Sequence, residues 1–202
     1  MEIIDYFDYN AIVTLSMFFI SLIIVFLNKI SNNWFNKHLF STQRGSWYNP
    51  FTYIRLFTHI LGHKDWKHFA NNYLKILLLG PLIEEKYGSI NFLIMILITA
   101  FVTGLVNLLK KKTNLKGASS VAFMLIVLSA FVNISGDKIP LTLVLIIIFY
   151  IIDEIKDLRK KDSVAHYGHL AGALCGLVFG FWFLGDNPLQ IVVDFINNIL
   201  NI

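Results

Sequence analysis

The stretch "GASSVAFMLIVLSAF", from Gly117 to Phe131, opens with a glycine and two serines and continues as a nearly unbroken apolar run. The lysine-rich segment "KKKTNLK" at 110–116 directly precedes it. An apolar run that begins beside basic residues is typical of a helix entering a membrane. A serine at a helix start is most often an N-cap, so Ser119 and Ser120 have a purely structural interpretation as well as a chemical one.

Five further apolar segments accompany this one in a chain of 202 residues, of which 56% are hydrophobic, with a mean hydropathy of +0.63. This composition is too apolar for an ordinary soluble domain. A helix needs roughly 20 mostly apolar residues to cross a bilayer, and the shorter segments reach that length with their polar neighbours. The sequence therefore predicts an all-α membrane protein with six transmembrane helices in one domain, 1–202. The segments are Ala11–Asn28, Tyr73–Ile83, Ile90–Leu109, Ala118–Val132, Ile139–Ile152 and Leu170–Leu184.

Basic residues are concentrated on one side of this predicted bundle. If the loops alternate across six spans, one side holds the 29–67, 110–116 and 156–161 loops and 14 of the 17 lysines and arginines. The positive-inside rule places that side in the cytoplasm.

A first polar cluster lies in "RLFTHILGHKDWKHFANNYL", Arg55–Leu74. His68 and Asn72 are four residues apart, so on a helix they project from one face and can donate hydrogen bonds to one point. Polar contacts between membrane helices are the alternative interpretation. A metal site built from His59, His63 and His68 is a weaker one, because no His-Glu-x-x-His motif and no suitably placed acidic ligand accompanies these histidines.

A second cluster lies in "AHYGHLAGALCGLVFGF", Ala165–Phe181. A glycine at every fourth residue makes a smooth stripe on which a neighbouring helix can pack closely. His169 is one turn before this stripe. If the stripe packs on the small side chains that begin the Gly117–Phe131 segment, His169 meets Ser119 and pairs a base with a nucleophile. The stripe consists of Gly172, Gly176 and Gly180, and the small partner residues are Ala118, Ser119 and Ala122.

Four separated motifs, in order, resemble those of the rhomboid family of intramembrane serine proteases over about residues 50–185. They are R-x-F-T-H-x-x-x-H at Arg55–His63, continued by the spacing of His63, His68 and Asn72; G-P-L-I-E-E-K-Y-G-S at Gly80–Ser89; G-A-S at Gly117–Ser119; and H-L-A-G-x-x-x-G at His169–Gly176.

The resemblance implies a six-helix rhomboid-like bundle with a catalytic dyad, Ser119 as nucleophile and His169 as general base. It implies that His68, Asn72 and the Ser119 backbone N–H bind the oxyanion, with Gly117 allowing close approach of the backbone. The resemblance also gives supporting roles to His63 and Phe123. Phe123 stands at the position of an aromatic residue that stacks on the base, His169. No cofactor or metal is implied.

The implied activity is cleavage of transmembrane segments of membrane-anchored proteins in the lipid bilayer, with no nucleic-acid partner. The implied location is multi-pass, in the cell membrane of a prokaryote, with the active site facing outward, which conflicts with the charge distribution. An inactive relative that binds transmembrane segments for quality control is the alternative function, and a small transporter or channel is a third. The oligomeric state is left open.

Three positions complicate the resemblance. His166 lies three residues before His169 and competes with it for the role of base. Ser120 replaces the glycine that usually follows the nucleophile, and its hydroxymethyl group either crowds the oxyanion site or adds a hydrogen bond. Val127 stands where a later glycine is expected, which predicts looser packing against a neighbouring helix.

Overall fold

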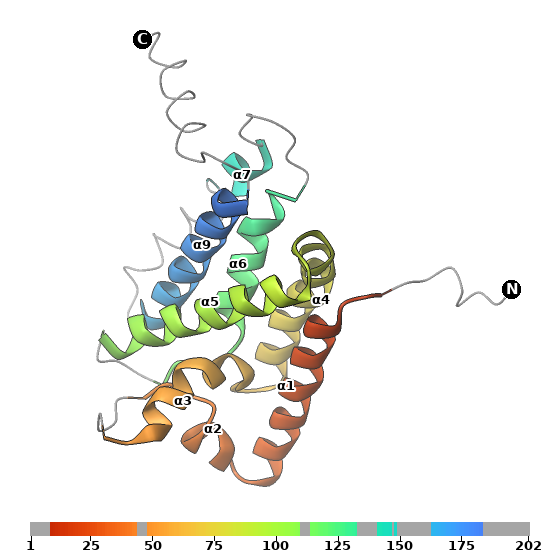
Figure 1. Ribbon diagram of the computed structural model, residues 1–202. Helices are drawn as coiled ribbons and strands as arrows, with labels where there is room; N and C mark the ends of the chain where they lie inside the picture. The colour runs from red at the N-terminus through yellow and green to blue at the C-terminus, as the bar shows by residue number, and fades with distance from the viewer. Residues whose placement is uncertain are drawn as a thin grey trace, which may run out of the picture.

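The computed structural model describes residues 9–43, 48–109, 114–132, 141–146, 148 and 163–183. These residues form helices, and one isolated bridge pairs Thr42 with Leu115 (Figure 1). The longer helices are α1 (Ile12–Ile30), α4 (Trp66–Tyr87), α5 (Ser89–Leu109), α6 (Ser119–Ser129) and α9 (Ser163–Phe183). The shorter ones are α2 (Trp34–His38), α3 (Pro50–Thr58), the 3-10 helix η2 (His59–Leu61) and α7 (Leu141–Ile146).

Five of the six predicted apolar segments coincide with α1, α4, α5, α6 and α9. The segment Ile139–Ile152 is described only in part, as α7, and its remainder lies outside the described residues. Within the described part of the chain, α1 and α5 are long and apolar enough to cross a membrane. The described part of the chain is therefore all-helical, with two clear candidate spans.

Helix α6 is the centre of the bundle. Figure 1 shows it between α4 and α9, with α5 crossing in front, and it packs against all three. Its side chains are buried over most of the circumference, with Val121, Met124 and Leu125 each 0% exposed. A helix that is apolar on every side belongs in an interior. The first turn of α6, which carries Ser119, is thereby fixed among three other helices.

The glycine stripe of α9 packs on α6, as its spacing predicts. A Cβ atom on Gly172 would strike the Ser120 backbone, and one on Gly176 would lie 2.5 Å from the Met124 carbonyl oxygen and 3.1 Å from the Val127 Cβ. The close face of α6 is therefore not the predicted set Ala118, Ser119 and Ala122. Val127 is 1% exposed and lies against Gly176, so the two helices are close at this position.

Glu84 joins the end of α4 to the start of α1. Its carboxylate, on a residue only 3% exposed, accepts hydrogen bonds from the Val13 N–H at 2.9 Å and from the Thr14 N–H and hydroxyl at 3.0 Å each. The Ser89 hydroxyl donates a fourth bond at 2.7 Å. A carboxylate at a helix N-terminus satisfies otherwise unpaired N–H groups and interacts favourably with the helix dipole.

Replacing Glu84 with alanine is expected to destabilise the protein by about 3 kcal/mol or more, because several donors lose a charged acceptor at a buried site. The measurement is reversible unfolding in detergent. The matched control is Glu85→Ala, which removes the same charge from an exposed neighbour and should change stability by less than about 0.5 kcal/mol. Equal losses in the two variants would contradict the assigned role of Glu84.

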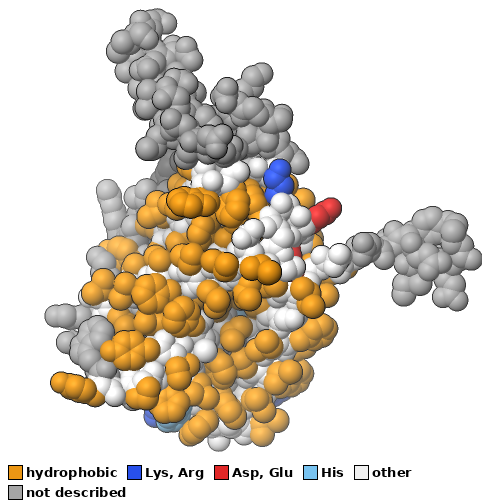
Figure 2. Space-filling model, viewed as in Figure 1, with side chains coloured by type: hydrophobic (Ala, Val, Ile, Leu, Met, Phe, Trp, Pro, Cys, Tyr) orange, Lys and Arg blue, Asp and Glu red, His pale blue; other side chains and the backbone are white. Residues whose placement is uncertain are grey.

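The outer surface of the bundle is apolar. Figure 2 shows hydrophobic side chains spread over much of the described surface on one face, with few charged groups. Exposed residues of α1 and α5 contribute to this surface, among them Phe19, Ile23, Leu93, Ile94 and Leu97. Contiguous apolar surface of this extent is unusual for a soluble monomer and is expected of a protein surrounded by lipid.

Candidate active site

The loop that leads into α6 is held by the segment between α1 and α4. The Thr42 N–H donates to the Leu115 carbonyl at 2.9 Å, and the Gly117 N–H donates to the His59 carbonyl at 3.0 Å. The Ala118 N–H donates to His63 Nε2 in a long bond of 3.4 Å. Three successive contacts thus fix the backbone immediately before Ser119.

His63 acts through this loop. Its ring is buried, with Nδ1 3.2 Å from the Leu61 carbonyl oxygen. Burial, and then the charge of nearby His68, lower the pKa of His63 to about 3. A neutral ring with its proton on Nδ1 donates to Leu61 and leaves the Nε2 lone pair to accept from Ala118. The geometry therefore gives His63 a positioning role.

Gly117 lies against His68 and Asn72. Its φ is +117°, in the region that favours glycine, and a Cβ there would lie 2.8 Å from His68 Nε2 and 3.4 Å from Asn72 Nδ2. No other residue fits this backbone without displacing the imidazole. The sequence-predicted cluster of Gly117, His68 and Asn72 is thus brought together at the start of α6.

The amide nitrogen of Asn72 makes no hydrogen bond to the part of the chain that the structure describes. The residue is 3% exposed, and among the described residues no hydrogen-bond partner is found for its Nδ2. A buried donor left unsatisfied costs roughly 1–3 kcal/mol, so such groups call for an explanation. The Nδ2 atom adjoins Gly117, two residues before Ser119, and is therefore available to an oxygen atom of a ligand bound there.

His169 and Phe123 join α9 to α6. Their rings stack, with centroids 4.4 Å apart and planes inclined by 9°. Phe123 is one turn beyond Ser119 on the same face of α6, so the imidazole lies beside the first turn of that helix. His169 is also close enough to His68 to interact with it electrostatically. The competing His166 is half-buried, and its ring meets His169 edge-on at 5.9 Å.

Ser120 is directed toward α5. It is 3% exposed, and its hydroxyl lies 3.4 Å from the Thr103 hydroxyl, while Ser119 is only half-buried. Thr103 in turn bonds the Thr99 carbonyl at 2.8 Å and lies 3.4 Å from His59 Nε2. Of the two sequence-based alternatives, the structure shows the added hydrogen bond.

Replacing Ser120 with alanine is expected to lower stability by about 1 kcal/mol, as for one buried hydrogen bond, without raising the rate of any reaction at Ser119. Thermal unfolding and probe-labelling rates measure the two effects. Ser129→Ala is the matched control, because that hydroxyl bonds within its own helix, to the Ile126 carbonyl. A faster reaction in Ser120→Ala would indicate crowding instead.

The polar face of α5 is a feature that the sequence analysis missed. Thr99, Thr103 and Asn107 are buried and spaced by four, so they form one stripe toward the loop before α6. Asn107 Nδ2 donates to the Thr42 hydroxyl at 2.7 Å. Polar residues at helical spacing within an otherwise apolar run were the available signal.

The alternative metal site is not supported. The ring of His59 is fully buried, and its Nδ1 lies 3.2 Å from the Arg55 carbonyl oxygen. In the described part of the chain, no group of three or more His, Cys, Asp or Glu side chains is placed to hold a metal ion.

The described residues form a helical bundle with an apolar surface, in which Gly117 lies against His68 and Asn72, and His169 stacks on Phe123, one helical turn from Ser119. The sequence model of the rhomboid domain family matches residues 50–186 of this chain, which is more than half of its length. The protein therefore belongs to the rhomboid family. A comparison with curated proteins found no significant match.

Proposed function

We propose that this chain is an intramembrane serine endopeptidase that cleaves transmembrane segments of membrane-anchored proteins with a Ser119–His169 dyad. The observation that carries the proposal is the Phe123–His169 stack, because it sets an imidazole beside the helical turn that begins with Ser119. A hydroxyl next to a neutral imidazole is the minimum needed for nucleophilic catalysis by serine.

The mechanism follows from the chemistry of these groups. The substrate helix unwinds locally, since an intact helix keeps its carbonyl groups in hydrogen bonds. Ser119 Oγ attacks the carbonyl carbon while His169 takes its proton, and His169 then protonates the departing amine. His169 then deprotonates a water molecule, which attacks the ester carbon of the acyl-enzyme; the bond to Ser119 Oγ breaks, and His169 returns the proton to Oγ as the carboxylic acid product leaves.

Asn72 Nδ2, His68 and the Ser119 N–H stabilise the oxyanion of both tetrahedral intermediates. Asn72 Nδ2 supports this assignment, because it has no hydrogen-bond partner among the described residues. A donor that is already removed from water and fixed in place stabilises developing negative charge most effectively. Gly117 keeps the approach open, as a side chain there would occupy the space beside His68.

The same proposal includes six transmembrane helices, with α1, α4, α5, α6 and α9 as five of them and the Ile139–Ile152 segment as the sixth. The site would lie below the membrane surface in a water-filled cavity, in the cell membrane of a prokaryote, facing outward.

Labelling of single cysteines introduced at Lys111 and Ser89, with Cys175 replaced, tests the orientation. Labelling of the Lys111 position only from the cytoplasm would overturn it.

A fluorophosphonate probe tests the chemistry directly. The probe should label the wild-type protein, and peptide mapping should place the adduct on Ser119. Labelling of Ser120, or of no serine in a folded sample, would contradict the proposal and favour the non-catalytic alternative.

A further inference from the structure

The loop before α6 carries a lysine, Lys116, whose two chain neighbours both contact the candidate active site. A Cβ atom on Gly117 would lie 2.8 Å from His68 Nε2. On the other side, a Cβ atom on Gly168, the residue before the proposed base, would lie 3.7 Å from Leu115 Cδ1. The backbone of Lys116 is therefore held beside both the proposed oxyanion donor and the helix that carries the base.

A second lysine, Lys64, approaches the same place from the segment that leads into α4. Lys64 and Lys116 are close enough to interact electrostatically with each other and with His68. Burial, and then the charge of Lys64, lower the pKa of the half-buried Lys116. The two ammonium groups thus concentrate positive charge at the edge of the candidate site.

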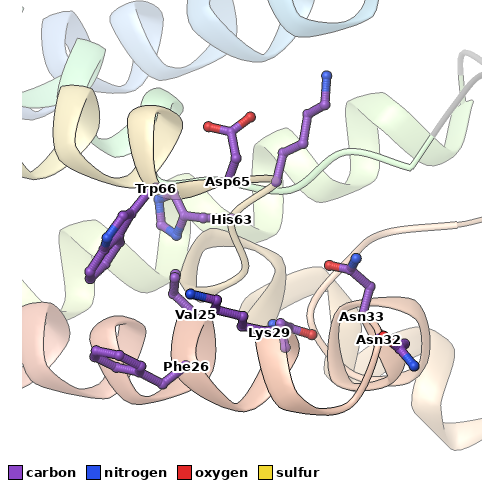
Figure 3. A pocket seen from close by; sticks show the side chains of 10 residues that line it. Val25, Phe26, Lys29, Asn32, Asn33, His63, Asp65 and Trp66 are labelled. Atoms are coloured by element: carbon purple, nitrogen blue, oxygen red, sulfur yellow. The ribbon is translucent and has the colours of Figure 1, made fainter.

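Asp65 compensates this positive charge only in part. Figure 3 shows its carboxylate on the side of the 63–66 segment that faces away from α1, whereas Trp66 is directed toward Phe26 of α1. The Asp65 Oδ1 caps α4 by accepting the His68 N–H at 2.8 Å. Neither lysine forms an ion pair or a side-chain hydrogen bond within the part of the chain that the structure describes. A half-buried ammonium without a counter-ion is stabilised by an anionic partner.

We propose that Lys116 and Lys64 select substrates that carry an acidic side chain close to the scissile bond, a preference that rests on the proposed protease activity. An extended chain advances ~3.3 Å per residue, so the acidic residue lies within about three positions of the bond that Ser119 attacks. The partner is a side chain of the substrate rather than a lipid headgroup, because the residues on both sides of Lys116 lie against the site itself. Complementary charge of this kind acts on recognition and specificity.

Cleavage of paired reporters in phosphatidylcholine proteoliposomes measures the preference. The two reporters of a pair differ only by glutamate or glutamine at one position near the scissile bond, and the position is varied from pair to pair. At the best position, the full-length wild type should cleave the glutamate reporter with a kcat/KM roughly 5- to 10-fold higher, chiefly through a lower KM. Added salt should reduce this ratio. Lys116→Gln and Lys64→Gln should each lower the ratio, and the double variant should abolish the preference.

Two variants serve as controls. Lys116→Glu should prefer a lysine reporter to a glutamate reporter, which is a change that misfolding cannot imitate. Lys37→Gln removes an exposed charge from α2, away from the site, and should keep the wild-type ratio.

The contradicting outcomes are distinct from one another. Equal kcat/KM for both reporters of every pair in the wild type would overturn the preference and leave the protease activity standing. A loss of kcat in Lys116→Gln that is the same for both reporters would place the ammonium at the oxyanion and overturn selection by charge. A loss with every reporter that appears only in liposomes containing phosphatidylglycerol would identify a lipid as the partner instead. Absence of both cleavage and fluorophosphonate labelling would overturn the proposed function, and this inference with it.

Discussion

Ser119→Ala is expected to abolish cleavage of a membrane-anchored reporter in proteoliposomes, with kcat reduced at least about 10⁴-fold. His169→Ala should have an equally large effect, and the double variant should be no worse than either single one, because nucleophile and base act as a unit. The measurement is the rate of product formation at saturating reporter. This result follows from the placement of the His169 imidazole beside the first turn of α6.

Two neighbouring residues provide the controls. Ser120→Ala removes the hydroxyl next to Ser119, which faces Thr103. His166→Ala removes the second imidazole of α9. Both variants should keep activity within about an order of magnitude of the wild type. Thermal unfolding of every variant establishes that it is folded. Substantial cleavage by folded Ser119→Ala would exclude the dyad, and loss of activity only in His166→Ala would transfer the role of base.

Asn72→Ala is expected to reduce kcat roughly 100- to 1000-fold while KM changes little, because an oxyanion donor acts chiefly in the transition state. Stability should not fall in proportion, since Nδ2 has no hydrogen-bond partner among the described residues. Steady-state kinetics in proteoliposomes and unfolding in detergent measure the two quantities.

The matched control for this prediction is Asn71→Ala, which removes the same side chain from an exposed neighbour on α4 and should leave kcat unchanged. If Asn72→Ala instead raised KM with kcat intact, the amide would be binding the substrate uniformly rather than its transition state.

The sequence predicts the helices well because their signal is local. Long apolar runs and the four-residue spacing of Gly172, Gly176 and Gly180 depend only on helical periodicity, and the structure places helices at five of the six predicted segments. Local signals do not fix which residues meet across helices, so the close partner of the stripe proved to be the face with Ser120 and Val127.

The direction of Ser120 was open for the same reason. A serine after the candidate nucleophile can project toward the proposed oxyanion site or toward α5. The choice depends on how α6 is rotated against α5, where Thr103 lies 17 residues before Ser120 in the sequence. The role of His63 was likewise visible only once its Nε2 was found facing the Ala118 N–H, across 55 residues of chain.

By itself, the sequence determined the apolar helices, the chemical identity of the candidate dyad and oxyanion donors, and their order along the chain. Only the tertiary structure decided that Gly117 faces His68 and Asn72 and that the Ser120 hydroxyl faces Thr103 on α5. The physical reason is that periodicity specifies a helix and its faces, whereas contacts between distant side chains depend on how closely and at what rotation the helices pack.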